Sequence, residues 1–142
     1  MIYIEDTDLK SVIQSRFIDN DFADLAASSD IIDDVEAKAI DYAKSYISTR
    51  YDVAKIFDET TPLRNGILLQ IIAQIVIYRA VRRNAARKVP DDFVNLMTEA
   101  TTMLSKIQGG AMVLVGLPLL TDEDGNETPL MWGNNENELN YI

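Results

Sequence analysis

The chain has 142 residues, a formal net charge of −10 at pH 7, and neither cysteine nor histidine. Disulfides, thiolate metal sites and the usual zinc sites are therefore excluded, and the commonest general base is absent. A chain of this length buries about 70% of its unfolded surface, enough for one domain without covalent cross-links. The composition thus removes the commonest metal ligands and the commonest general base of enzymes.

The charge is divided unevenly along the chain. Residues 1–59 carry 14 acids and 6 bases (net −8), residues 60–110 carry 3 acids and 7 bases (net +4), and residues 111–142 carry 6 acids and no base (net −6). Because phosphate binding needs clustered lysine and arginine, such a chain repels nucleic acid overall. The acidity favours solubility, and it also suits a protein that lies beside DNA without holding it.

Two helices are predicted in the N-terminal half. The first is short, begins at Asp6 or Thr7, and has an apolar side made of Leu9, Val12, Ile13 and Phe17. The second has Asp30 as its cap and an apolar stripe at helical spacing, made of Ile32, Val35, Ala39, Ala43, Tyr46 and Ile47. This pattern fades near Arg50 and Tyr51, and a loop is predicted for residues 52–60.

A buried central helix is predicted next. Thr61 followed by Pro62 is a helix-start signal, because the hydroxyl caps a free amide and proline lacks the amide that the first turn would leave unpaired. From Leu63 to about Arg83 apolar residues point almost all round, which is typical of a helix surrounded by others. Residues 67–81 are too short and too interrupted to cross a bilayer. The N-terminus MIYIEDTDLK also lacks the pattern of a signal peptide, so we expect an intracellular product.

The last predicted helix starts after Pro90 and ends at Gly109 and Gly110, where glycine permits a left-handed residue. Its apolar stripe is Phe93, Leu96, Met97, Ala100, Leu104 and Ile107. The helical period then stops, and short apolar runs flank a turn of sequence DEDGNE. The predicted fold is mainly α, with four to five helices around a buried central helix in residues 1–110. An extended or β-hairpin C-terminal arm follows in residues 111–142.

Acidic groups that could suggest chemistry have simpler explanations. DEDGNE lacks the spacing of a calcium loop, since Gly125 is its fourth residue and an EF-hand needs glycine at the sixth. The pairs Asp33–Asp34 and Asp91–Asp92 fall in first turns of predicted helices, where the dipole favours anions. We therefore predict no catalytic residue and no metal ligand.

The candidate partner-binding residues are a basic cluster and a few large side chains of the tail. One basic cluster falls at the end of the central helix: Arg79, Arg82, Arg83, Arg87 and Lys88. Cations at a helix C-terminus complement the dipole, and this is the first interpretation of the cluster. A docking face for acidic segments of a neighbouring subunit is the second, and DNA binding is the third.

Three apolar residues of the tail are further candidates: Trp132, Tyr141 and Ile142. They lie outside every predicted helix, so they must either fold back on the body or be buried by a partner.

Three segments in this order resemble the head-tail connector, or adaptor, proteins of tailed bacteriophages, especially the short Mu-like group. They read IDYAKSYISTRYDVAKIF, TPLRNGILLQIIAQIVIYRAVRRNAARKVPDDF and MTEATTMLSKIQGGAMVLVG. In that group a helix ends in an Arg-Tyr pair (here Arg50 and Tyr51). A proline-initiated helix then ends in tyrosine and arginines, and a last helix closes with glycine before an extended tail. The resemblance covers residues 3–115. Residues 19–30 and the chain beyond Gly116 do not match.

The resemblance implies a structural virion protein that is not an enzyme and has no cofactor, and the absence of histidine and cysteine agrees with this. Its copies would form a ring, expected to be dodecameric, docked on the portal protein around the channel for DNA packaging and ejection. Downstream tail or stopper proteins would bind the ring, and DNA would pass through without specific binding. The protein would be made in the host cytoplasm and reside in the virion neck at the portal vertex, with no membrane contact.

Two functions of other classes remain open on the sequence alone. An acidic helical inhibitor or DNA mimic would bind a basic partner through the Asp-rich N-terminal half. A magnesium-dependent enzyme would need carboxylates that converge, and the sequence has neither a phosphate loop nor a spacing that brings them together.

Overall fold

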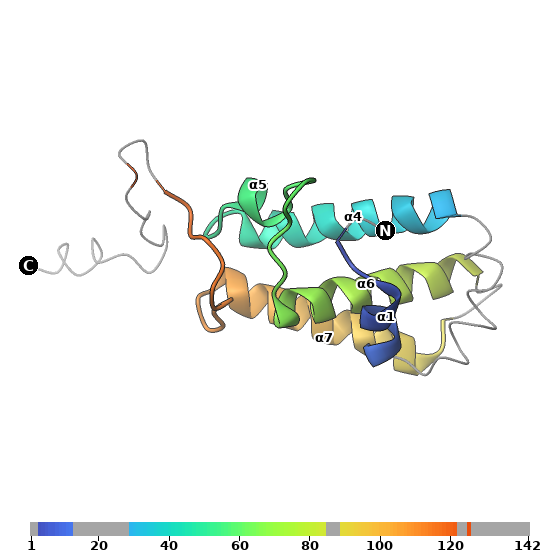
Figure 1. Cartoon of the computed structure of the whole chain (residues 1–142). Coiled ribbons are helices and arrows are strands. Elements are labelled where there is room, and N and C mark those ends of the chain that lie inside the picture. Colours follow the sequence, from blue (N-terminus) through green and yellow to red (C-terminus); the bar gives the residue numbers. More distant parts are fainter. Residues whose placement is uncertain (1–2, 13–28, 85–88, 122–124, 126–142) are drawn as a thin grey trace, which may run out of the picture.

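The computed structural model describes residues 3–12, 29–84, 89–121 and 125, and the mainly helical fold predicted from the sequence is confirmed (Figure 1). Within this part of the chain there are five helices and no β-strand. The helices are α1 (Asp6–Val12), α4 (Ser29–Ile47), α5 (Val53–Ile56), α6 (Gly66–Asn84) and α7 (Asp91–Gln108). None of these helices is both long enough and apolar enough to cross a membrane.

Helix α6 is the centre of the fold, as predicted. It packs against α1, α4 and α7, and all seven residues from 71 to 77 are buried. Helices α4, α6 and α7 lie side by side and alternate in direction, so that α4 and α7 end where α6 begins (Figure 1). The C-terminal end of α6 therefore lies at the other end of the bundle.

The start of α6 differs from the prediction. The helix begins at Gly66 and not at Leu63, because the Asn65 side chain provides the cap: its Oδ1 accepts hydrogen bonds from the amides of Ile67 (3.0 Å) and Leu68 (3.2 Å). Thr61 and Pro62 instead belong to a non-helical lead-in. The Asn65 cap, three residues downstream of the proline, thus decides where the helix begins.

Helix α4 packs with its predicted stripe inward, but it also buries a charge. Val35, Ala39, Ala43 and Ile47 are buried, and Ile32 and Tyr46 are half-buried. Glu36 is fully buried. Its Oε1 accepts hydrogen bonds from two backbone amides of the N-terminal segment, those of Tyr3 (2.7 Å) and Ile4 (2.9 Å). The carboxylate holds this segment against the bundle.

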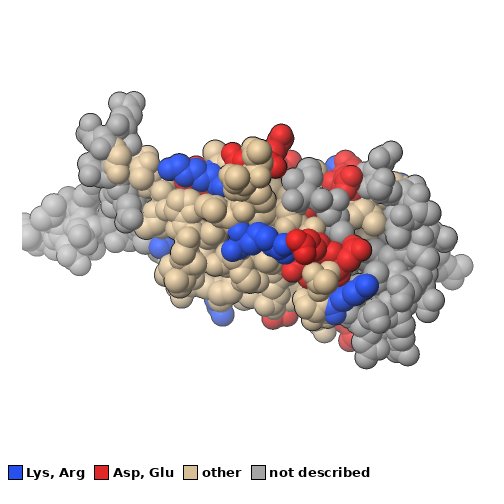
Figure 2. All heavy atoms as spheres, viewed as in Figure 1, with Lys and Arg blue, Asp and Glu red and all other residues tan. Residues whose placement is uncertain are grey.

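The Tyr3 side chain also faces the core. Its hydroxyl donates to the carbonyl of Leu63 at 2.8 Å, and its ring lies 4.8 Å from that of Phe57. Burial raises the pKa of Tyr3 to about 12. Outside the core, Arg64 pairs with Glu5 and Asp8 on the surface that carries α1. Acidic and basic side chains lie next to each other on this face (Figure 2).

The predicted loop at residues 52–60 contains a one-turn helix, α5. Asp52 caps it by accepting from the amide of Lys55 (3.3 Å), and Ile56 is fully buried. After α5, the Asp58 carboxylate accepts from the amides of Thr60 (2.8 Å) and Thr61 (2.9 Å), and these bonds lower the pKa of Asp58. The buried Ile56 and the Asp52 cap thus stabilise a single helical turn, which the sequence pattern did not predict.

Helix α7 follows the prediction closely. It begins after Pro90, and four of its stripe residues are buried: Phe93, Ala100, Leu104 and Ile107. It ends at Gln108 with Gly109 as its C-cap, and Gly110 has a φ of 82°, the left-handed conformation expected of the terminal glycines.

The first part of the predicted C-terminal arm packs on the helical body. Leu114 is 1% exposed, and an isolated antiparallel bridge pairs Tyr51 with Leu119. The rest of the arm, apart from Gly125, lies outside the described residues, as do Ile13 and Phe17 of the first predicted helix.

Candidate partner-binding site

The predicted basic cluster lies at the C-terminal end of α6. Arg82 and Arg83 are in the last turn and exposed, and neither forms an ion pair with a residue that the structure describes. Arg79 is on the same side one turn earlier and is half-buried. We call these three arginines the basic face. Arg87 and Lys88 lie outside the described residues.

An aromatic pair on α4 adjoins the basic face. The guanidinium carbon of Arg79 lies 5.5 Å from the centre of the Tyr42 ring, within the range of a cation–π contact. The hydroxyls of Tyr42 and Tyr46 are 3.2 Å apart. Their hydrogen bond raises the pKa of Tyr46, and burial and the Tyr42 charge act in the same direction. Tyrosine and arginine are the residue types enriched in binding hot spots.

A second surface lies where α4 and α7 end. The Tyr51 hydroxyl accepts a hydrogen bond from the amide of Leu114 (2.8 Å). Two backbone bonds lie beside it: the amide of Asp52 donates to the carbonyl of Pro118 (3.0 Å), and the amide of Leu120 donates to the carbonyl of Arg50 (2.9 Å). We call this contact between residues 50–52 and 114–120 the C-terminal junction. It determines the place from which the chain beyond Thr121 continues.

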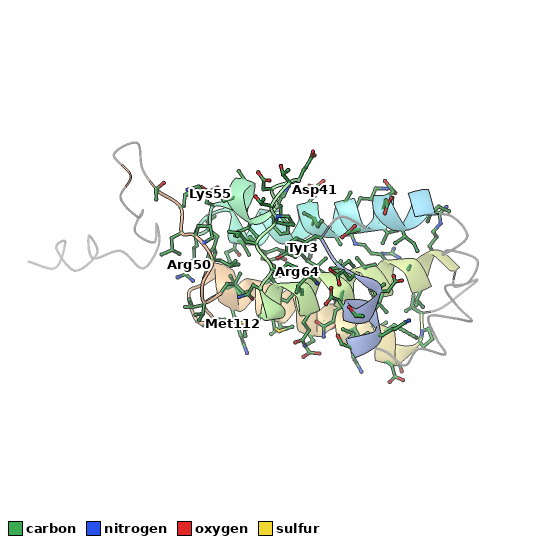
Figure 3. The ribbon with its side chains drawn as sticks, viewed as in Figure 1. Tyr3, Asp41, Arg50, Lys55, Arg64 and Met112 are labelled. Atoms are coloured by element: carbon green, nitrogen blue, oxygen red, sulfur yellow. The ribbon has the colours of Figure 1, made fainter. Side chains whose placement is uncertain are left out.

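Arg50 connects the junction to the end of α7. Its Nη1 donates to the carbonyl of Ile107 at 3.0 Å, and its guanidinium carbon lies 5.7 Å from the centre of the Tyr51 ring. The same carbonyl also accepts a hydrogen bond from the amide of Gly110 at 3.2 Å, so Arg50 adds a second donor at the end of α7. Arg50 and Met112 therefore lie at the same end of the bundle (Figure 3).

Apolar side chains are exposed next to the junction. Val113 is 51% exposed and Val115 is 80% exposed, on either side of the buried Leu114. Asn65 Nδ2 donates to the carbonyl of Val115 at 3.0 Å, which holds this turn beside the start of α6. The predicted tail anchors Trp132, Tyr141 and Ile142 lie outside the described residues.

A groove of about 470 Å³ between α1, α6 and α7 is separate from both surfaces. Gln74 lines it, is 2% exposed, and donates through Nε2 to Glu99 at 3.0 Å. The Oε1 of Gln74 has no hydrogen-bond partner in the described part of the chain, but this atom is itself buried, so the groove offers it no direct contact with a ligand. Across the described ranges, no three side chains of His, Cys, Asp or Glu gather as metal ligands.

The sequence predicted the basic face but missed two parts of the site. Tyr42 was not singled out, and Tyr46 was assigned to the core stripe, although their i, i+4 spacing on one helix could have indicated a pair. The bonds of Arg50 and Tyr51 were missed because their partners lie more than 50 residues away in the sequence.

Comparison of the chain with protein-family models, with curated proteins and with solved structures gave no match.

Proposed function

We propose that this protein is a head-tail adaptor of a tailed bacteriophage, a structural virion protein whose copies form a ring docked on the portal around the DNA channel. One observation supports the proposal most. The basic face and the C-terminal junction, the two candidate contact surfaces, lie at opposite ends of the helical body (Figure 1).

Two different surfaces on one subunit favour a ring. When one surface of each copy binds the other surface of the next copy, the contact is head-to-tail. Such contacts generate a closed ring if the rotations between successive copies add up to a full turn. The resemblance to the adaptor family suggests twelve copies. The described helices supply a rigid body for such a ring, because the centre of α6 is completely buried.

The charge of the chain suits a channel wall. A net charge of −10 opposes tight binding of phosphates, so DNA would pass through the ring without being held. In this proposal the portal lies on one side of the ring and a tail or stopper protein on the other, in the virion neck. The tail residues Trp132, Tyr141 and Ile142 would contact the portal or a neighbouring copy.

Assembly on the portal tests this function. The purified protein would be mixed with the portal encoded in the same genome and imaged by electron microscopy. We expect an additional ring on the portal, whereas the isolated protein stays largely monomeric in size-exclusion chromatography with light scattering. Arg87 and Lys88 would contribute with the basic face to contacts in the ring.

An unrelated portal serves as the control, because a sticky protein would decorate both. Absence of a ring on the cognate portal at high protein concentration would exclude the adaptor function.

A further inference from the structure

The basic face lacks an acidic partner among the described residues, whereas four other basic side chains of this part of the chain have one. Lys38 pairs with Asp34 at 2.6 Å, Lys55 pairs with Asp52 at 3.6 Å, and Arg64 contacts two carboxylates of its own chain. Arg82 and Arg83 have no such partner among the described residues. Two adjacent exposed guanidinium groups with a cation–π contact beside them form a surface that fits an acidic segment.

The same chain contains a segment of the required charge. The six residues that follow Thr121 read DEDGNE, with four acids and no base. They begin at the C-terminal junction, because Leu120 is bonded to the carbonyl of Arg50. Thr121, which precedes this acidic segment (residues 122–127), thus lies at the end of the body opposite to Arg82 and Arg83.

The reach of the chain argues against pairing within one copy. Helix α6 has 19 residues, which corresponds to a length of about 27 Å at the usual helical rise. Six fully extended residues span at most about 20 Å. The backbone of six extended residues is thus shorter than α6, while a second copy placed head-to-tail presents Arg82 and Arg83 beside the start of the acidic segment.

We propose that residues 122–127 of one copy bind the basic face of the next copy, with their carboxylates on Arg82 and Arg83. This inference rests on the proposed ring and names the two surfaces that meet in it. Bidentate contacts between guanidinium and carboxylate would set the orientation of neighbouring copies.

Cysteine cross-linking tests the pairing directly, because the natural chain has no cysteine. The full chain would carry Arg83→Cys and Asn126→Cys, which leave Arg82 and all four acids in place. Disulfide formation traps contacts too weak to survive chromatography, so under mild oxidation at high protein concentration we expect a ladder of disulfide-linked multimers even though the reduced protein is largely monomeric. A disulfide formed only within one copy, or no disulfide at all, would overturn the proposal.

A charge exchange tests the chemistry. One variant carries Arg82→Glu and Arg83→Glu, and the other carries Asp122→Lys and Asp124→Lys. We expect the multimer yield under chemical cross-linking to fall at least tenfold for each variant alone. A mixture of the two should recover it, because the acidic segment of the first variant then meets the arginines of the second, and the lysines of the second meet the glutamates of the first. Lys106→Glu is the matched control, since Lys106 is exposed in the last turn of α7.

The outcomes separate this inference from the proposed function. If the arginine variant still forms a ring on the portal and cross-links like the natural chain, the pairing is wrong and the adaptor function remains. If the ladder forms as expected but no ring forms on the portal, the pairing remains and the adaptor function is wrong. Salt-sensitive binding of a duplex DNA probe that is lost in the arginine variant would assign the basic face to DNA instead.

Discussion

The two ends of the chain are attached to the helical body in different ways. At the N-terminal end, one buried carboxylate, Glu36, accepts the amides of both Tyr3 and Ile4. At the C-terminal end, several neutral hydrogen bonds and the buried Leu114 share the attachment. At the N-terminal end both backbone bonds converge on one charged side chain, beside the contacts of the Tyr3 side chain and of Arg64, whereas at the C-terminal end the backbone bonds are distributed over several residues. A single substitution should therefore damage the first severely, whereas only deletion should remove the second.

Deletion of the distributed attachment should have the largest effect. Truncation after Gly110 removes the buried Leu114 and every bond of the C-terminal junction, so we expect the free energy of unfolding to fall by about 4 kcal/mol or more. Truncation after Thr121 keeps these contacts and should leave the stability unchanged while it abolishes ring formation. Urea denaturation followed by circular dichroism measures both. Equal stability of the two truncated chains would instead place the boundary of the body at residue 110, as the sequence pattern predicts.

Substitution of Glu36 should be the most damaging single change. Glu36→Ala leaves two backbone donors of the N-terminal segment without their acceptor, and we expect a loss of about 3 kcal/mol. Glu36→Gln retains one acceptor oxygen and should lose less. Asp34→Ala is the matched control on the same helix: its ion pair with Lys38 is exposed, so its effect should stay below about 0.5 kcal/mol. Similar losses for Glu36→Ala and Asp34→Ala would show that the carboxylate does not hold the segment.

A single change in the distributed attachment should be milder. Tyr51→Phe removes the acceptor of the Leu114 amide but keeps the packed ring, so we expect a loss of about 1 to 2 kcal/mol. Hydrogen exchange should show faster exchange of that amide, while the amides of Asp52 and Leu120 stay protected. Tyr46→Phe, which loses only a partly exposed bond to Tyr42, serves as the control. If exchange accelerates equally across the whole junction, its bonds form one cooperative unit and the attachment is not distributed.

This contrast between the ends also shows what the sequence could reveal. The central helix and α7 were predictable, because their apolar patterns and the proline before α7 are local signals. Glu36 was not, since a glutamate on an amphipathic helix is normally exposed and only the fold brings the two amides to it. The junction joins residues more than 60 positions apart, and no periodicity encodes such pairing.

The candidate site divides in the same way. The basic face was predictable, because three arginines at helical spacing before a helix end must share one side. Its contact with Tyr42 was not, because it depends on how α4 and α6 pack against each other.

The smallest expected effect at neutral pH concerns Tyr3. It tests whether the N-terminal segment is attached so closely that the Tyr3 hydroxyl is buried. Burial raises the pKa of Tyr3 to about 12 from the 10.0 of an ordinary tyrosine. The folded chain thus holds this proton more tightly than the unfolded chain. The corresponding stability is fully present below pH 10 and is lost between about pH 10 and 12, by about 2 kcal/mol in total.

Tyr3→Phe loses the hydrogen bond to Leu63 and should lower stability by about 1 kcal/mol at pH 7, but it should also flatten the alkaline decline. The difference between the natural chain and Tyr3→Phe, measured by urea denaturation at pH 8 to 12, isolates this residue from other tyrosines. Tyr46→Phe controls for the second tyrosine with a raised pKa. A difference that stays constant across this range would mean that the hydroxyl ionises freely in the folded chain, so that the N-terminal segment is open to water.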